Sequence, residues 1–217
     1  MSLPWRLITV DIDGTLTRGH GWQYIADGLG RRREFDAVMA EFRRGGVSED
    51  RHLERLLALA EGHMVEEVLA LVASTPRVSG IRETNDRLHG WGIRVALLSH
   101  NPPYVGRWYA ETFGFDGFAV MPGAYDAPGP LTAPVGVRAD KPGGLRQLTE
   151  QFQISPRRVL HVGDGEADAA LFPRVGGGVA FNSREAGVRA AADMVVDADD
   201  WSAILPVVRR LRPRAER

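Results

Sequence analysis

The chain has 217 residues, a hydrophobic fraction of 44%, a charged fraction of 25% and a formal net charge of −1. These values are typical of one large folded domain or a core with a modest insert, and they argue against nucleic acid or an anionic membrane as a partner. The absence of cysteine excludes disulfides, thiolate metal sites and a cysteine nucleophile. No apolar stretch is long enough for a membrane span and no signal-peptide pattern is present, so we expect a cytoplasmic protein.

Short apolar runs predict the strands of a parallel sheet buried on both faces, because most of them lack polar alternation. These runs are residues 6–10, 93–98, 158–162, 177–181 and 193–196. Helical patterns lie at 80–90, 103–113, 141–152, 166–172, 183–191 and 201–211. The alternation predicts an α/β fold with a Rossmann-like, doubly wound parallel-sheet core, in which Pro206 starts or kinks the last helix.

The segment after the first strand breaks this alternation. It contains helical stretches at 20–29, 31–44, 48–61 and 64–74 and no convincing strand. Ser48, followed by Glu49 and Asp50, is a suitable N-cap for the third stretch. We therefore predict a small all-helical cap at 17–77, inserted into a catalytic core formed by 1–16 and 78–217. The Pro- and Gly-rich region 121–139 is expected to be a loop, with a short hairpin as an alternative.

Polar side chains gather at the ends of the predicted strands. They are Asp11 and Asp13 after the first strand, Ser99, His100 and Asn101 after the second, Asp164 and Asp168 after the third, and Lys141 at the start of a helix. Ligands of open parallel sheets bind outside the carboxyl ends of the strands. We therefore expect these residues to meet at one edge of the sheet.

This set of residues suits a phosphate ester as substrate. Clustered carboxylates repel one another and a phosphate unless a hard cation such as Mg²⁺ lies among them. One carboxylate can attack phosphorus, and a second can protonate the leaving alcohol. Lys141, Ser99 and backbone N–H groups near residues 100 and 101 can bind the phosphoryl oxygens.

Four segments, DIDGTLT, LLSHNP, DKPGGL and VGDGEAD, occur in this order in the chain. Together they resemble the four signature motifs of the haloacid dehalogenase-like hydrolases. The helical insert resembles the cap of the phosphoserine phosphatase-like branch of that family. The resemblance implies that Asp11 is the nucleophile and a metal ligand. It implies that Asp13 is the acid and base and offers its backbone carbonyl to the metal, that Asp164 ligates Mg²⁺, and that Asp168 supports the metal site or Lys141.

The resemblance also implies a phosphate site. Its expected members are Ser99, His100, Asn101 and Lys141, with Gly14 and Thr15 shaping the loop. Phosphoserine phosphatases usually have two glycines after the serine, where this chain has His100 and Asn101. The acidic residue with which they recognise the substrate amino group aligns with His20. Their carboxylate-binding arginine aligns with Arg55, for which a solvated helix arginine is the alternative.

The sequence thus predicts a Mg²⁺-dependent phosphatase that hydrolyses a small phosphorylated metabolite through an aspartyl-phosphate intermediate, with His20 and Arg55 as substrate-selecting cap residues. Because His20 cannot pair with an ammonium group as a glutamate would, we expect phosphoserine to be a poor substrate. Phosphoserine phosphatase proper, a phosphotransferase or mutase, and a non-catalytic binding module remain as alternatives. His161 is expected to be a satisfied core histidine, and His52, His63 and His89 to be surface residues.

Overall fold

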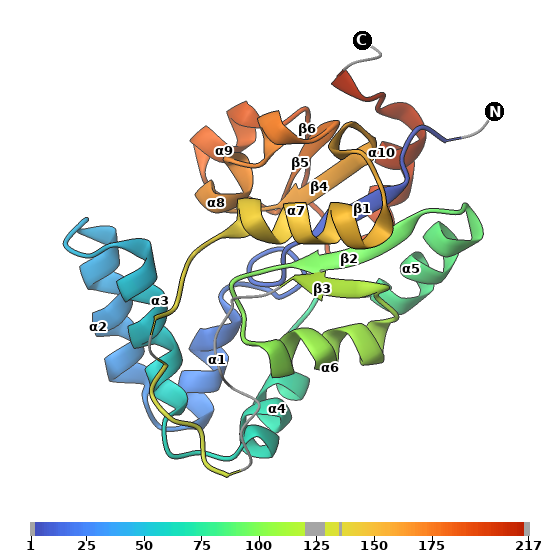
Figure 1. Cartoon of the computed structure of the whole chain (residues 1–217). Coiled ribbons are helices and arrows are strands. Elements are labelled where there is room, and N and C mark those ends of the chain that lie inside the picture. The colour runs from blue at the N-terminus through green and yellow to red at the C-terminus, as the bar shows by residue number, and fades with distance from the viewer. Residues whose placement is uncertain (1–2, 120–128, 135, 215–217) are drawn as a thin grey trace.

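The protein, described here by a computed structural model covering residues 3–119, 129–134 and 136–214, contains a six-stranded parallel sheet with the strand order β3-β2-β1-β4-β5-β6 (Figure 1). The strands are β1 (Leu7–Val10), β2 (Arg94–Leu98), β3 (Gly117–Ala119), β4 (Val159–Gly163), β5 (Gly177–Phe181) and β6 (Met194–Val196). The order reverses at β1, which pairs with β2 on one side and β4 on the other. This arrangement confirms the Rossmann-like core and places a ligand crevice outside the carboxyl end of β1.

Strand β3 was missed by the sequence reasoning. It has three residues, and its Gly117 pairs with Ala96 of β2 at the edge of the sheet. A run this short shows no periodicity that distinguishes a strand from a loop. Its pairing is a tertiary contact with β2, which local sequence does not encode.

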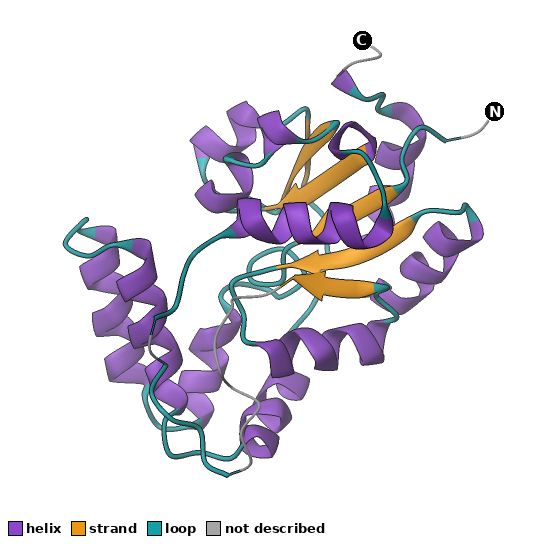
Figure 2. Cartoon of the chain, viewed as in Figure 1, coloured by secondary structure: helices purple, strands orange, loops and turns teal. Residues whose placement is uncertain are grey.

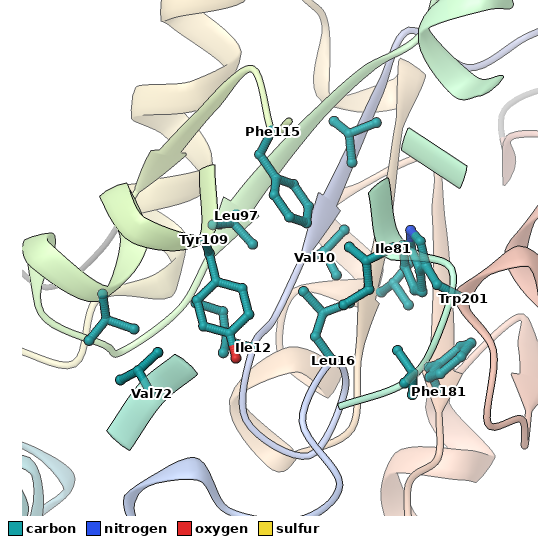
Figure 3. Packing of buried hydrophobic residues seen from close by; sticks show 14 of the residues in the cluster. Val10, Ile12, Leu16, Val72, Ile81, Leu97, Tyr109, Phe115, Phe181 and Trp201 are labelled. Atoms are coloured by element: carbon teal, nitrogen blue, oxygen red, sulfur yellow. The ribbon is translucent and has the colours of Figure 1, made fainter. Parts of the chain in front are cut away.

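Helices cover both faces of the sheet (Figure 2). One face carries Ile8 and Val10 and packs against α5 (Ile81–Gly90), α6 (Pro103–Phe113) and α10 (Ile204–Arg210). Figure 3 shows Leu97 beside Tyr109 in this layer, together with Val10. The other face carries Leu7 and packs against α7 (Lys141–Phe152). No helix among the described residues is long and apolar enough to cross a membrane.

The helices near the C-terminus are shorter than predicted. They are α8 (Glu166–Ala169), α9 (Ala186–Ala191) and α10, with 3₁₀ turns at Pro156–Arg158, Phe172–Arg174 and Trp201–Ala203. The last of these turns leads directly into α10, so Pro206 lies in the first turn of that helix. Proline is tolerated there because the N–H groups of the first turn have no intrahelical acceptor.

The predicted insert consists of α1 (Gly21–Gly28), α2 (Arg32–Arg43), α3 (Glu49–Leu57), a 3₁₀ turn (Ala58–Ala60) and α4 (Val65–Ser74). Ser48 caps α3 by accepting a hydrogen bond from the backbone N–H of Arg51, as the sequence predicts. An isolated antiparallel bridge between Thr17 and Arg77 joins the chain where it leaves and re-enters the core. The bridge falls at the predicted limits of the cap, and the behaviour of 17–77 as a separate unit stays a prediction.

The segment before α7 runs along the insert. Leu131 exchanges two backbone hydrogen bonds of 2.8 Å, one with Gly62 and one with His63. Further on, the backbone N–H of Ala139 donates to the Asp50 carboxylate of α3 at 2.7 Å. Residues 129–134 and 136–139 form no strand, and the rest of the predicted hairpin region lies outside the described residues. The segment thus connects the insert to the start of α7.

Candidate active site

The loop after β1 holds two of the predicted catalytic carboxylates. Asp11 is buried, and its backbone N–H donates to the Val162 carbonyl at 3.0 Å, which fixes it beside β4. Gly14 has a φ of +78°, and a Cβ atom there would lie 2.1 Å from an Asp164 carboxylate oxygen. Glycine is therefore required both for the backbone conformation and for the close approach. Thr15 donates a 3.0 Å hydrogen bond to Asp164, so Gly14 and Thr15 position that carboxylate in addition to shaping the loop.

Three acidic side chains converge at the carboxyl ends of β1 and β4. One oxygen each from Asp11, Asp164 and Asp168 lies within 4.8 Å of the others. Burial raises the pKa of Asp11 to about 7, against the opposing charge of Lys141. Burial likewise raises the pKa of Asp164 to about 8, assisted by the negative charges of Asp11 and Asp168. The cluster therefore carries more negative charge than the protein compensates.

Lys141 is the cation of this cluster. It begins α7, where the Asp140 side chain caps the helix by accepting from the Gly143 N–H at 2.7 Å. Its Nζ lies 2.5 Å from Asp168 Oδ1 and 3.1 Å from Asp11 Oδ1. Burial alone would lower the pKa of Lys141, but the charges of Asp11 and Asp168 raise it above its ordinary value. The ammonium group thus stays charged at the floor of the site.

The side chain of Asp168 is held in place by hydrogen bonds from three protein groups. It accepts hydrogen bonds from Lys141, from His161 Nε2 at 3.0 Å and from the Gly165 N–H at 3.1 Å. Burial opposes its ionisation, but the Lys141 charge and the His161 hydrogen bond hold the pKa of Asp168 below its ordinary value. His161 is fully buried and also contacts the Thr9 hydroxyl at 2.9 Å, which confirms that it is a satisfied core histidine. Its position shows in addition that it orients Asp168.

Asp13 is connected to both the core and the insert. Its carboxylate accepts from the Asn101 amide at 2.7 Å and from the Gly21 N–H, the first residue of α1, at 2.6 Å. The Trp22 indole donates to the Asn101 carbonyl oxygen at 3.1 Å, and the Asn101 amide also contacts the buried Ser99 hydroxyl at 3.0 Å. The side chain of Asn101 therefore positions Asp13 and Ser99. The sequence predicted only that backbone N–H groups near residue 101 bind phosphate.

These residues form the floor of a pocket of about 330 Å³ whose opposite wall comes from the insert. The wall consists of His20, Trp22, Met39, Phe42, Glu49, His52, Leu53 and Leu56. Of the predicted residues, Asp11, Asp13, His20, Ser99, His100, Lys141, Asp164 and Asp168 all line this pocket. Two sequence segments about 90 residues apart thus meet as predicted, at the carboxyl ends of β1 and β2.

Two predictions about the insert were wrong or unsupported. His52 is not a surface residue: it is 6% exposed and stacks on Phe42 with ring centroids 4.0 Å apart. Its spacing of one and four residues from Leu53 and Leu56 places it on the apolar face of α3, and that spacing was the available signal. Arg55 pairs with Glu41 of α2, remains partly exposed and does not line the pocket. The structure therefore does not bring Arg55 to the site.

Residues 5–176 match the haloacid dehalogenase-like hydrolase family. The chain belongs to this family. It is 28% identical over 184 residues to a phosphoserine phosphatase of Archaeoglobus fulgidus, covering 83% of this chain and 53% of that protein. It is 27% identical over 205 residues to a phosphoserine phosphatase of Wolinella succinogenes, covering 92% of this chain and 98% of that one. The chain thus spans about half of the first relative and nearly all of the second.

Solved structures of the haloacid dehalogenase-like hydrolases have the same fold. A family hydrolase from Salmonella enterica subsp. enterica serovar Typhi superposes with a TM-score of 0.85 at 18% identity, over 96% of this chain and 73% of the other. A substrate-bound phosphoserine phosphatase superposes with a TM-score of 0.78 at 22% identity, over 94% of this chain and 98% of the other. At these identities the superpositions establish the architecture and not the substrate.

Proposed function

We propose that this chain is a Mg²⁺-dependent phosphatase that hydrolyses a small phosphomonoester through an aspartyl-phosphate on Asp11. The observation that carries the proposal is that Asp11, Asp13, Ser99 and Lys141 line one pocket, with the Lys141 ammonium 3.1 Å from Asp11. A nucleophile, a proton carrier and two groups that bind phosphoryl oxygens therefore face the same space.

The acidic cluster fits a hard divalent cation. Its ligand atoms are all carboxylate oxygens, which a hard cation prefers. The pKa values of Asp11 and Asp164 are raised because these carboxylates are buried close to other negative charges, which Lys141 alone does not balance. Asp11, Asp164 and the backbone carbonyl of Asp13 would hold the ion, while Asp168 supports the site through Lys141. When bound, the cation offsets the charge of the carboxylates and of the phosphate.

The side chains then divide the chemistry into two steps. A carboxylate oxygen of Asp11 attacks phosphorus, the bond to the ester oxygen breaks, and the leaving alkoxide takes a proton from Asp13. Asp13 next removes a proton from water, whose oxygen attacks the aspartyl-phosphate and releases inorganic phosphate with Asp11 restored. Lys141 and Ser99 bind the phosphoryl oxygens throughout.

We also propose that residues 17–77 act as a cap that selects the substrate. Helices α1, α2 and α3 supply the wall opposite the carboxylates, and Gly21 of α1 donates directly to Asp13. Substrate discrimination therefore depends on residues of the insert, whereas the chemical step depends on the core.

Phosphate release from p-nitrophenyl phosphate with Mg²⁺ tests the proposal. Asp11→Asn keeps the shape of the nucleophile but removes its attacking charge, so activity should fall to background. Asp36→Asn, at an exposed carboxylate of α2, is the matched control and should retain wild-type turnover. Near-normal turnover of Asp11→Asn would contradict the mechanism, and a wild type without activity would favour a binding module. Product analysis with an added alcohol acceptor distinguishes hydrolysis from phosphotransfer.

A further inference from the structure

The pocket contains an unusual group of buried polar atoms without partners. Among the described residues, the buried side-chain nitrogen and oxygen atoms that lack a hydrogen bond are Nε1 of Trp5, Nδ1 of His20, Nδ1 of His52 and Nε2 of His100. The three histidines all line the pocket. A buried polar atom left unpaired destabilises the protein, because it loses its hydrogen bonds to water without replacement. The three nitrogens belong to side chains that line one space, and a ligand bound there is the source of hydrogen-bond partners that we consider.

The ring of His52 is held in one plane by its neighbours. The side chain is 6% exposed, and its stacking on Phe42 at an interplanar angle of 15° fixes the plane of the imidazole. His20 precedes α1 and packs edge-on against Phe35 at 5.6 Å. Neighbouring aromatic residues therefore hold both rings in place beside the pocket.

His52 and His100 are suited to uncharged partners. Burial lowers the pKa of His52 to about 4, assisted by the charges of His20 and Arg55. Burial also lowers the pKa of His100 to about 3, assisted by Lys141. A neutral imidazole nitrogen donates or accepts according to its tautomer, which matches a hydroxyl group that does both.

Charge in the pocket disfavours a second negative group on the substrate. Among the described residues that line it, Lys141 is the one lysine or arginine, and the carboxylates are Asp11, Asp13, Glu49, Asp164, Glu166, Asp168 and Glu185. Arg55, which could have bound a substrate carboxylate, pairs with Glu41 outside the pocket. Because Lys141 serves the phosphate, a carboxylate on the leaving group would have no further lysine or arginine among the residues lining this pocket to pair with.

Glu49 is the acidic residue that the insert contributes to this wall. Its Oε1 lies 3.5 Å from His100 Nδ1, beside the loop that contains Ser99. Burial raises the pKa of Glu49 above its ordinary value. The remainder of the wall, formed by Trp22, Met39, Phe42, Leu53 and Leu56, is apolar except for the histidines.

We propose that this pocket selects phosphomonoesters whose alcohol part is uncharged and bears further hydroxyl groups, as in a polyol or sugar phosphate, with His20 and His52 as hydrogen-bonding residues. The proposal rests on the phosphatase function proposed above. The apolar wall packs against the carbon skeleton of such a substrate, and the histidine nitrogens pair with its hydroxyl groups.

A substrate panel tests the proposal with the intact protein and Mg²⁺. Sorbitol 6-phosphate and glucose 6-phosphate represent the predicted class, and phosphoserine, phosphoethanolamine and phosphoglycolate represent charged alcohols. We expect kcat/KM for the better neutral substrate to exceed each charged one by about tenfold or more. A charged substrate that equals or exceeds both neutral ones overturns this inference and leaves the phosphatase function intact. Loss of all activity, including that on p-nitrophenyl phosphate, overturns the phosphatase function itself.

Variants of His52 test the residue assignment. His52→Phe keeps an aromatic ring against Phe42 but removes the nitrogens, so the kcat/KM ratio of the better polyol or sugar phosphate to p-nitrophenyl phosphate should fall about tenfold. His52→Asn keeps a polar atom near the Nδ1 position and should retain more of that ratio. His63→Phe, at a cap histidine outside the pocket, is the matched control and should leave the ratio unchanged. An unchanged ratio in a folded His52→Phe protein contradicts the assignment.

Discussion

Replacing Asp164 by asparagine should stabilise the metal-free protein at alkaline pH while it destroys the metal site. The Asp164 carboxyl has a pKa of about 8 in the folded protein, against 3.8 in the unfolded chain, because burial and the charges of Asp11 and Asp168 oppose its ionisation. A raised carboxyl pKa contributes stability below pH 3.8, and this contribution is lost as the pH rises through 8. The metal-free wild type should therefore weaken over this range.

The pKa gives the size of the effect. The full difference between 3.8 and about 8 corresponds to about 5 kcal/mol at pH 8. Water reaches the half-buried carboxylate, and asparagine loses the charge-assisted hydrogen bond from Thr15, so we expect a net gain of about 1–3 kcal/mol. For a chain of this length that gain corresponds to a rise in Tm of roughly 3–10 °C.

Thermal unfolding with a chelator at pH 5 and pH 8 measures this prediction. Asp164→Asn should melt above the wild type at pH 8 and close to it at pH 5, where the wild-type carboxyl is already protonated. Added Mg²⁺ should raise the Tm of the wild type and not that of the variant. Asp36→Asn, at an exposed carboxylate, should show neither effect. The reasoning is refuted if Asp164→Asn melts at or below the wild type at pH 8 without metal.

Three further predictions concern activity. Asp13→Asn should slow hydrolysis of alkyl phosphates more than that of aryl phosphates, because poor leaving groups depend most on the proton; equal losses for both would contradict its role as the acid. A chelator should abolish turnover and Mg²⁺ should restore it, whereas Ca²⁺, which coordinates more loosely, should support it poorly; chelator-resistant activity would argue against the metal. Gly21→Ala should lower kcat about tenfold or more, since its Cβ would lie 2.4 Å from an Asp13 oxygen. The matched control is Gly90→Ala, at a glycine of α5 with open space around it and no positive φ, and equal kcat for both variants would count against the contact.

The sequence by itself predicted the core chemistry because those residues lie in short motifs whose positions follow from local pattern. Asp11 and Asp13 end an apolar run, Asp164 ends another, and Lys141 begins a helical pattern. The carboxyl ends of parallel strands lie at one edge of a sheet, so the convergence of these groups follows from the strand assignment alone. The α/β class and the helical insert were predictable for the same reason, since each depends on periodicity within a segment.

The tertiary structure alone decided how the insert faces the core. The packing of α2 against α3 pairs Arg55 with Glu41 and buries His52 against Phe42, and these contacts depend on the relative rotation of two helices. The contact of Gly21 with Asp13 likewise depends on how the chain turns between β1 and α1. Such contacts join residues of different helices and loops, and the sequence periodicity within one helix carries no information about the position of the next. A sequence pattern thus located the proposed catalytic groups, whereas only the packed structure determined which side chains of the insert line the pocket.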